Sequence, residues 1–170
     1  MLENSILAWG GAGLLLIGEI LALRNVNNLK RVLLFSTIAE IGYIGLGIGL
    51  GSFAAETGAF LHIGLQSVMR LLVFISACVL IKDAGSSSLD KLSGSGQRMP
   101  FIATIFGFGL FSVMGLSPFK GSFSKFLIIY GAVEQEQWLL ALICTLASII
   151  AAVYYLHVIQ RICLEKSKNC

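Results

Sequence analysis

The sequence predicts an all-α, polytopic membrane protein with about five transmembrane helices, one of them discontinuous. The composition is 56% hydrophobic and only 12% charged, about half the charged fraction of a water-soluble domain. Apolar runs of about 20 residues, the length that crosses the roughly 30 Å hydrocarbon core, recur along the chain. One of these runs is interrupted in its middle by a proline and a glycine. We therefore expect a single transmembrane helical domain over residues 1–170.

Five segments are expected to cross the bilayer, and a polar connection is expected to join the third to the fourth. The expected spans are residues 5–23, 30–51, 54–82, 101–130 (broken near 116–122) and 137–162. No basic residue precedes the first run and no small-residue cleavage site follows it, so we interpret it as a membrane helix rather than a signal peptide. The 83–100 segment is rich in Ser and Gly and is interpreted as a cytoplasmic loop.

The charged residues at the ends of the spans and beyond them divide unequally between the two sides of the membrane. One side carries nine basic residues: Arg24, Lys30, Arg31, Lys82, Lys91, Arg98, Arg161, Lys166 and Lys168. The other side has no Lys or Arg and carries four acidic residues: Glu3, Glu56, Glu134 and Glu136. Because basic loops stay in the cytoplasm, we expect the N-terminus outside and the C-terminus on the cytoplasmic side, or on the matrix side in a mitochondrial inner membrane.

The first span contains an acidic residue, Glu19, within the sequence GGAGLLLIGEILAL. The glycines of this sequence allow another helix to approach closely. A carboxyl group at this depth is expected to be paired or protonated. Two interpretations remain open. Glu19 either takes part in proton exchange or is a neutral carboxyl that is hydrogen-bonded to a neighbouring helix.

The third span carries three polar residues, His62, Gln66 and Arg70, at successive spacings of four. At roughly 100° per residue they lie on one face of a helix, spread over about 12 Å along its axis. An ionisable group at this depth costs about 2.5 kcal/mol or more, so this face is expected to meet protein or a water-filled path rather than lipid. The alternative is that Gln66 and Arg70 only hold helices together.

The fourth span changes character where SPFKGSFSK separates FIATIFGFGLFSVMGL from FLIIYGAV. Pro118 removes a backbone donor and disfavours helical geometry in the residue before it, and Gly121 follows closely. A helix broken at membrane depth is tolerated where its backbone is buried in protein or lines a wet cavity. Lys120 and Lys125 lie at this break, an arrangement that many transporters use for an ion site. The alternative is a helix that ends near Leu116, followed by an aqueous loop.

No cofactor, metal or nucleic-acid partner is expected. The four cysteines lie singly and form no metal-spaced pair: Cys78, Cys144, Cys163 and Cys170. The basic residues cluster at helix ends rather than in a patch interleaved with aromatic residues. Tyr155 and His157 in the last span are interpreted as packing or interfacial residues. Any electron transfer is therefore expected to take place in partner chains.

Three stretches carry a family resemblance. NLKRVLLFSTIAEIGYIGLGIG, FLHIGLQSVMRLLVFISA and LDKLSGSGQRMPFIATIFGFGLFSVMGLSPFKGSFSKF follow one another in the order in which the family has its Lys-Arg motif, its next helix and its discontinuous helix. They resemble the antiporter-like membrane subunits of respiratory complex I, shared with multisubunit cation/proton antiporters and energy-converting membrane hydrogenases. The match covers about Glu19 to Leu164. It implies the second of the family's two inverted five-helix repeats, with the first repeat supplied by another chain.

The resemblance also implies roles for individual residues. Lys125 matches the charged residue of the broken helix, which is implicated in ion exit to the outside, and Lys30 matches the motif lysine. His62, Gln66 and Arg70 match the polar ladder, and Glu40 lies where the family often has His or Gln. The departures from the family pattern include Ser117, which replaces a proline, and Lys120, which replaces an uncharged residue.

Two departures in the ladder alter its chemistry. A relay residue must both accept and release a proton, which a desolvated Lys can do. Neither the guanidinium of Arg70 nor the amide of Gln66 can do so. We interpret Gln66 as a residue that orients water and Arg70 as a fixed positive charge that keeps a nearby carboxylate ionised. The remaining titratable groups are Glu19, Glu40, His62, Lys120 and Lys125.

These features favour a membrane subunit of a complex I-like or hydrogenase-like ion-pumping assembly that contributes a proton or sodium half-channel. Its expected partners are other membrane subunits and, indirectly, peripheral redox subunits. The first alternative is a non-conducting structural or anchoring subunit of the same kind of assembly, which the fixed Arg70 and Gln66 favour. A second alternative is a stand-alone transporter formed by antiparallel dimerisation. The unequal charge distribution argues against the latter, because a dual-topology protein has nearly balanced ends.

Overall fold

The protein is a helical bundle. The computed structural model describes the backbone at residues 2–115 and 121–165 and the side chains at residues 4–115 and 123–165. The helices are α1 (Leu2–Arg24), α2 (Leu29–Gly49), α3 (Phe53–Ala84), α4 (Leu89–Leu92), α5 (Ser95–Arg98), α6 (Pro100–Met114), α7 (Gly121–Glu134) and α8 (Trp138–Ile159), and a π-helical turn, η1 (Gln160–Leu164), follows α8.

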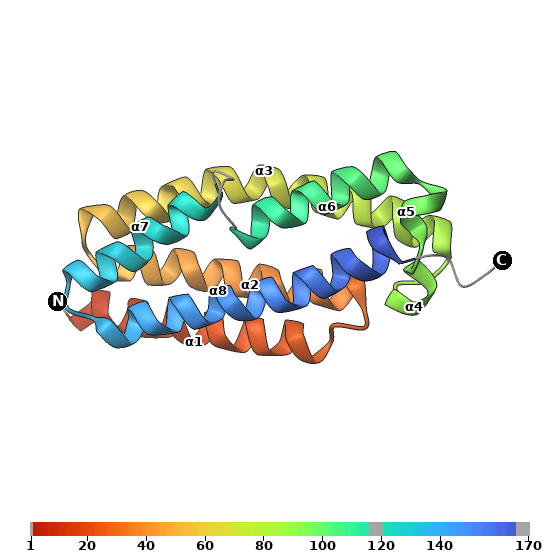
Figure 1. The fold of residues 1–170 in the computed structure, drawn as a ribbon. Helices are drawn as coiled ribbons and strands as arrows, with labels where there is room; N and C mark the ends of the chain where they lie inside the picture. Colours follow the sequence, from red (N-terminus) through yellow and green to blue (C-terminus); the bar gives the residue numbers. More distant parts are fainter. Residues whose placement is uncertain (1, 116–120, 166–170) are drawn as a thin grey trace.

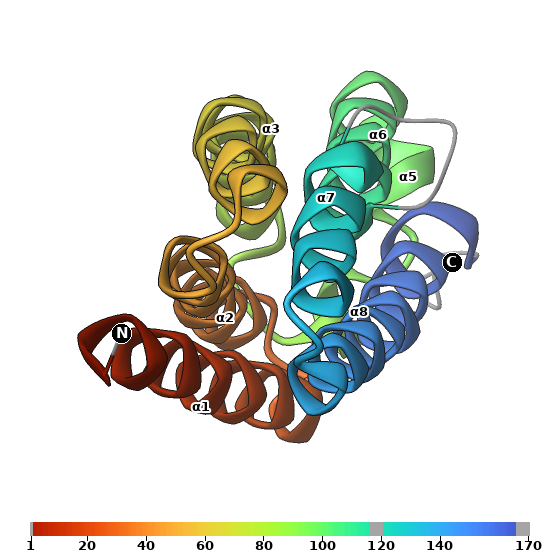
Figure 2. The same ribbon diagram turned by 90° about the vertical axis from the view of Figure 1, so that its left-hand side faces the viewer.

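The long helices run along one common direction (Figure 1). The two shorter helices α6 and α7 follow one another along α3, α6 beside the half of α3 nearer α5 and α7 beside the other half (Figure 1). Seen end on, α3, α2 and α1 follow one another around one side of the bundle, and α8, α7 and α6 lie around the other (Figure 2). The interior between these two groups is where polar side chains from different helices meet.

Small residues let α1 and α2 pack closely. A Cβ atom added to Gly11 of α1 would lie 2.8 Å from the carbonyl oxygen of Gly42 in α2, which is closer than real Cβ atoms come. A Cβ atom at Gly18 would overlap Ala39 in the same way. This confirms that the glycines near Glu19 allow a close helix–helix approach, a feature typical of membrane helices. The contact also brings Glu19 to the level of Ala39, the residue before Glu40.

The helix α3 is continuous and carries the polar ladder. Its 32 residues are about 48 Å long at 1.5 Å per residue. It begins after Ser52, whose side chain accepts a hydrogen bond from the backbone N–H of Ala55, and ends at Gly85 in the left-handed conformation. Its length allows both α6 and α7 to pack along it, and two residues of the ladder meet them: Gln66 contacts Val113 of α6, and His62 contacts Ser124 of α7.

The discontinuity falls between Met114 and Gly121. The helix α6 has 15 residues and stops before Gly115, which has a φ of 77° that only glycine adopts readily. The helix α7 has 14 residues. Each is shorter than the roughly 20 residues that a membrane crossing needs. Pro118 and Lys120 lie outside the described residues.

The 83–100 segment has more structure than the sequence analysis expected. It contains α4 and α5, and its leucines Leu89 and Leu92 are fully buried. Its backbone is tied to the turn between α1 and α2, since the N–H of Leu89 donates to the carbonyl of Asn27. Arg161 of η1 also forms an ion pair with Asp90 at 2.8 Å. The high Ser and Gly content of this segment predicted a loop, but the burial of Leu89 and Leu92 holds the segment against the end of the bundle.

The predicted fold class is confirmed. In the described part of the chain, 88% of which is helical, four helices are long and apolar enough to cross a membrane, and a fifth span is possible if the bent pair formed by Leu89–Arg98 and Pro100–Met114 counts as one. These ranges contain no β-strand, only an isolated bridge between Asn28 and Ser88. The chain is an all-α integral membrane protein.

Candidate functional site

A buried carboxylate lies at the centre of the bundle with three basic side chains around it. The Oε2 atom of Glu40 contacts Nε2 of His62, and its Oε1 atom lies 3.1 Å from Nη2 of Arg70 and 3.7 Å from Nζ of Lys125. We call these four residues the Glu40 cluster. They come from α2, α3 and α7, and each is at most 8% exposed. Buried charges are tolerated when they are paired in this way.

Both ring nitrogens of His62 have a polar partner. Nε2 meets Glu40, and Nδ1 lies 3.0 Å from the hydroxyl of Ser124, the residue before Lys125. A serine hydroxyl can donate or accept a hydrogen bond. The contacts therefore fit a ring whose Nε2 carries a proton that Glu40 accepts, while Nδ1 can either accept from or donate to Ser124.

Arg70 is held by four groups from two helices, α2 and α8. Its Nη1 atom donates to the hydroxyls of Ser36 at 2.9 Å and Thr37 at 3.1 Å. Its Nη2 atom pairs with Glu40 and makes a long hydrogen bond of 3.5 Å to the hydroxyl of Tyr155. A guanidinium remains charged in proteins. Arg70 is therefore a fixed cation that permanently offsets the charge of Glu40.

The break between α6 and α7 supplies an acceptor to two predicted site residues. The carbonyl oxygen of Val113, in the last turn of α6, accepts hydrogen bonds from Nζ of Lys125 at 3.4 Å and from Nε2 of Gln66 at 3.3 Å. Carbonyls in the last turn of a helix have no partner within the helix and carry partial negative charge. The end of α6 thus explains why a lysine is stable at this depth.

Tyr43 supports the cluster from α2. Nζ of Lys125 lies 4.9 Å from the centre of its ring, within cation–π range, and the ring of His62 lies 5.5 Å away. The Tyr43 hydroxyl donates to the carbonyl of Cys144 at 2.7 Å and lies 2.6 Å from the hydroxyl of Ser148. These contacts with α8 fix the ring on which Lys125 rests.

The structure does not bring every candidate residue into the cluster. Glu19 is buried on α1 near Tyr154 and makes no ion pair with the four residues. Lys30 is exposed at the start of α2, ten residues or about 15 Å along the helix from Glu40. Gly121 begins α7. As already noted, the other two candidates, Lys120 and Pro118, fall in the undescribed segment.

Several supporting residues were not singled out from the sequence. Tyr43 lies three residues after Glu40, a spacing that places both on one helix face. Ser124 immediately precedes Lys125. Tyr155 was interpreted as a packing or interfacial residue, and it is indeed buried, but it also contacts Arg70. The helical spacing and the chain adjacency could have suggested the first two, whereas no pattern in the sequence indicated the contact of Tyr155.

A small opening between α2 and α3 reaches the cluster from the side. Its volume is about 150 Å³. It is lined by Thr37, Glu40, Ile41, Ile44, His62, Ile63, Gln66, Ser67 and Arg70. Three of the four cluster residues therefore line this opening.

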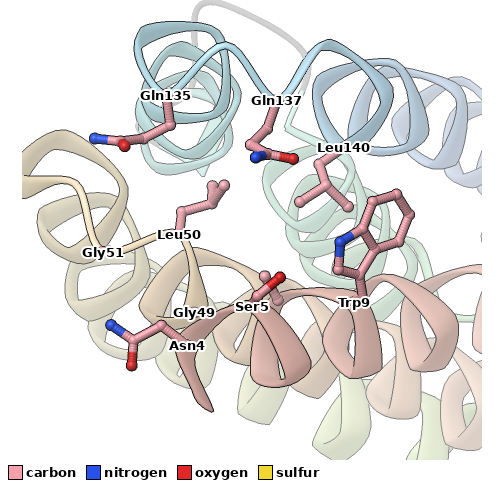
Figure 3. A pocket seen from close by; sticks show the side chains of 10 residues that line it. Asn4, Ser5, Trp9, Gly49, Leu50, Gly51, Gln135, Gln137 and Leu140 are labelled. Carbon is pink, nitrogen blue, oxygen red and sulfur yellow. The ribbon is translucent and has the colours of Figure 1, made fainter. Parts of the chain in front are cut away.

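A larger, more polar cavity lies at the end of the bundle where α1 begins. Its volume is about 350 Å³. Figure 3 shows Asn4 and Trp9 of α1 facing it from one side, and Gln135 and Gln137 from the turn between α7 and α8 on the other. The buried residues Leu46 on α2 and Ile128 on α7 stand between the level of this cavity and the level of the Glu40 cluster. The cluster is thus separated from this end of the bundle by apolar side chains.

The bundle contains a buried carboxylate that is paired with basic side chains, next to the end of a broken helix. These features define a polytopic membrane protein with ionised residues inside its membrane-spanning part. A model of the family described as "NADH:quinone oxidoreductase/Mrp antiporter, TM" matches residues 2–151. The chain belongs to this family. The resemblance inferred from the three sequence stretches is therefore confirmed.

Two relatives illustrate how much of the family's length this chain represents. It is 33% identical over 157 residues to NADH-quinone oxidoreductase subunit N 1 of Rhizobium meliloti, an alignment that covers 91% of this chain and 32% of that protein. It is 34% identical over 145 residues to NADH-quinone oxidoreductase subunit N of Pelagibacter ubique, covering 84% of this chain and 31% of the relative. The chain spans about a third of the length of these relatives.

Solved structures share the fold. A chain of the membrane-bound sulfane sulfur reductase, an archaeal respiratory membrane complex, aligns with a TM-score of 0.90 at 23% identity, over 97% of this chain and 34% of that one. A chain of respiratory complex I from Thermus thermophilus aligns with a TM-score of 0.89 at 23% identity, over 98% of this chain and 35% of that one. A chain of the Mrp complex from Dietzia sp. DQ12-45-1b aligns with a TM-score of 0.86 at 26% identity, over 96% of this chain and 31% of that one. The first two likenesses concern the fold alone.

Proposed function

We propose that this chain contributes a proton half-channel to a complex I-like or hydrogenase-like membrane assembly. The observation that carries the proposal is the Glu40 cluster, which is buried beside the break between α6 and α7. Ionisable groups are expensive at this depth and are retained where they serve ion movement. The family and its solved structures support the same conclusion at the level of antiporter-like membrane subunits.

The geometry divides the roles among the four residues. The two oxygens of Glu40 face different titratable bases, His62 on one side and Lys125 on the other. Both bases lie against the same carboxylate, so a proton that passes between them stays beside Glu40 throughout. Arg70 sets the local field and does not carry the proton. His62 and Lys125 are thus the carriers in this proposal, and Glu40 is the bridge between them.

A proton fits the cluster better than sodium. Hard cations such as Na⁺ are bound by several oxygen ligands, as in Ca²⁺ and Mg²⁺ sites. The carboxylate oxygens of Glu40 already face three basic side chains, His62, Arg70 and Lys125. A sodium ion at Glu40 would therefore meet Arg70 as a neighbouring fixed positive charge. Exchange of a proton between His62 and Lys125 does not require an additional cation to bind at Glu40.

The proposal includes partners and an orientation. We infer that other membrane subunits surround the chain and that further polypeptide supplies the first inverted repeat. The α4–α5 end of the bundle carries Arg24, Lys30, Lys91, Arg98 and Arg161, which supports placing this end in the cytoplasm. The start of α1, with the cavity of Figure 3, then faces the outside.

Replacement of Lys125 by alanine in the full assembly tests the proposal. The assembly is reconstituted into vesicles, and ion translocation is measured together with electron transfer. Lys125→Ala is expected to abolish or slow translocation while electron transfer by peripheral subunits continues. The control is Lys91→Ala, which removes an exposed lysine of α4. Unchanged translocation in Lys125→Ala would remove Lys125 from the mechanism.

The structural alternative also has an observation in its favour, since Arg70 can neither accept nor release a proton. In that case the chain is a non-conducting membrane anchor of the same assembly. Combined neutralisation of Glu40, His62 and Lys125 distinguishes the two functions. An anchor tolerates the triple change with an unaltered ion-to-electron ratio, whereas a half-channel loses its share of that ratio.

A further inference from the structure

Glu19 is a buried acid outside the Glu40 cluster. It lies on α1, is 2% exposed, and its Oε2 atom has no hydrogen-bond partner among the described residues. Its carboxyl group faces Tyr154 of α8, whose hydroxyl likewise lacks a partner of standard geometry. Two polar groups that could pair with each other thus lie close together in the interior. A buried polar group left in this state calls for an explanation.

Two tyrosines connect Glu19 with the Glu40 cluster. The rings of Tyr154 and Tyr155 are 4.4 Å apart, and each residue is 1% exposed. The hydroxyl of Tyr155 accepts the long hydrogen bond from Arg70, which pairs with Glu40. A phenol hydroxyl can both donate and accept a hydrogen bond. Two adjacent tyrosines of α8 therefore lie between Glu19 and Arg70, and their hydroxyls are the polar groups available there.

When Lys125 is protonated, the cluster contains more cations than its single carboxylate can balance. Glu40 is already balanced by Arg70, which is 3.1 Å away and always cationic. A proton on Lys125 adds a second cation to the same buried space. Uncompensated charge is unfavourable there. Glu19 is the other acidic side chain that is buried in the described part of the bundle, and it has no cation as an ion-pair partner there.

Building on the half-channel of the proposed function, we propose that Glu19 is a second proton-binding site that acts as the counter-charge of Lys125. Glu19 gives up its carboxyl proton as the Lys125 amine becomes an ammonium, so one proton changes place and no net charge is added to the interior. The hydroxyls of Tyr154 and Tyr155 provide the polar route between α1 and the cluster. When Lys125 releases its proton to the outlet, Glu19 takes up the next proton from the opposite side of the membrane, so each cycle moves one proton.

The alternative is that Glu19 is a permanently neutral carboxyl that only holds α1 against α8. Glu19→Gln separates the two roles, because glutamine has nearly the same shape and hydrogen-bonding groups but cannot titrate. In the full assembly in vesicles, we expect this variant to slow ion translocation by about a hundredfold or more, which is the scale of losing a proton-transfer group. The matched control is Glu56→Gln, which alters an exposed acid in the first turn of α3.

Infrared spectroscopy gives a readout that a structural role would not change. The C=O stretching band of a protonated carboxyl should be present in the wild-type assembly, decrease as pH is raised, and be missing from Glu19→Gln. In Lys125→Met the band should persist across the pH range, since the cation that Glu19 balances is gone. In Tyr154→Phe the band should shift in frequency but remain. The control for the last change is Tyr130→Phe, at an exposed position on α7.

The outcomes separate this inference from the proposed function. Slow translocation in both Lys125→Ala and Glu19→Gln, with a carboxyl band that depends on Lys125, supports the counter-charge role. Slow translocation in Lys125→Ala with wild-type rates in Glu19→Gln overturns the role of Glu19 and leaves the half-channel standing. Wild-type rates in both overturn the two together. A carboxyl band whose titration is the same with and without Lys125 also overturns the counter-charge role.

Discussion

Removal of Arg70 should destabilise the bundle, and the structure indicates by how much. Arg70→Gln eliminates the ion pair with Glu40 and the hydrogen bonds to Ser36, Thr37 and Tyr155. Removing one partner of a buried ion pair typically costs about 3–5 kcal/mol, because the other charge is left behind. Glu40 retains His62 and Lys125 as partners. We therefore expect a loss at the lower end, about 3 kcal/mol.

The comparison with Arg70→Lys isolates the contribution of charge. Lysine keeps a positive charge near Glu40 but cannot reproduce the planar fork that reaches several acceptors at once. We expect this variant to lose about 1–2 kcal/mol, the worth of one or two hydrogen bonds. The free energy of unfolding is measured by denaturant titration of the purified chain in detergent micelles. Equal destabilisation of the two variants would refute the idea that Arg70 stabilises the fold by balancing the charge of Glu40.

Three further changes test other parts of the structure. Tyr43→Phe keeps the ring under Lys125 but removes the hydroxyl contacts with α8, so we expect a loss of about 1–2 kcal/mol by the same titration with most ion translocation retained. Gly42→Leu should prevent the α1–α2 contact and lower the yield of folded chain on gel filtration, whereas Gly64→Leu, at a position with open space around it, should not. Leu92→Ala should destabilise the α4–α5 end by about 2–5 kcal/mol, seen as faster proteolysis of the 83–100 segment.

The sequence allowed the fold class and the polar face of α3 to be predicted because both depend on local pattern. Apolar runs long enough to cross a bilayer are visible without knowledge of packing. The spacing of four between His62, Gln66 and Arg70 places them on one face of any helix, and the structure shows all three buried. The partners of this face could not be found in the same way. Glu40 lies 22 residues before His62 and Ser124 lies 62 after it, and local periodicity does not determine which helices meet.

The residues missed by sequence reasoning are those whose roles arise from packing. Val113 contributes only a backbone carbonyl, which is available because α6 ends one residue later. No side-chain pattern can reveal it. Leu89 and Leu92 occur in a stretch dominated by Ser and Gly, where two leucines carry little weight until a bundle end is there to receive them. Composition describes an average, whereas the anchoring of this segment depends on two particular side chains.

The presence of arginine at position 70 changes where a balancing charge must come from. With a titratable lysine at that position, protonation at 70 and at 125 could alternate, and Glu40 alone would balance whichever base was charged. Arginine is always charged, so it permanently balances the negative charge of Glu40. Lys125 then needs a different acid whenever it holds a proton, and the close packing of α1 against α2 brings Glu19 to the required depth. If Glu19 is the counter-charge that we propose, Arg70 and Glu19 form a compensating pair, and Arg70→Lys should make translocation less sensitive to Glu19→Gln.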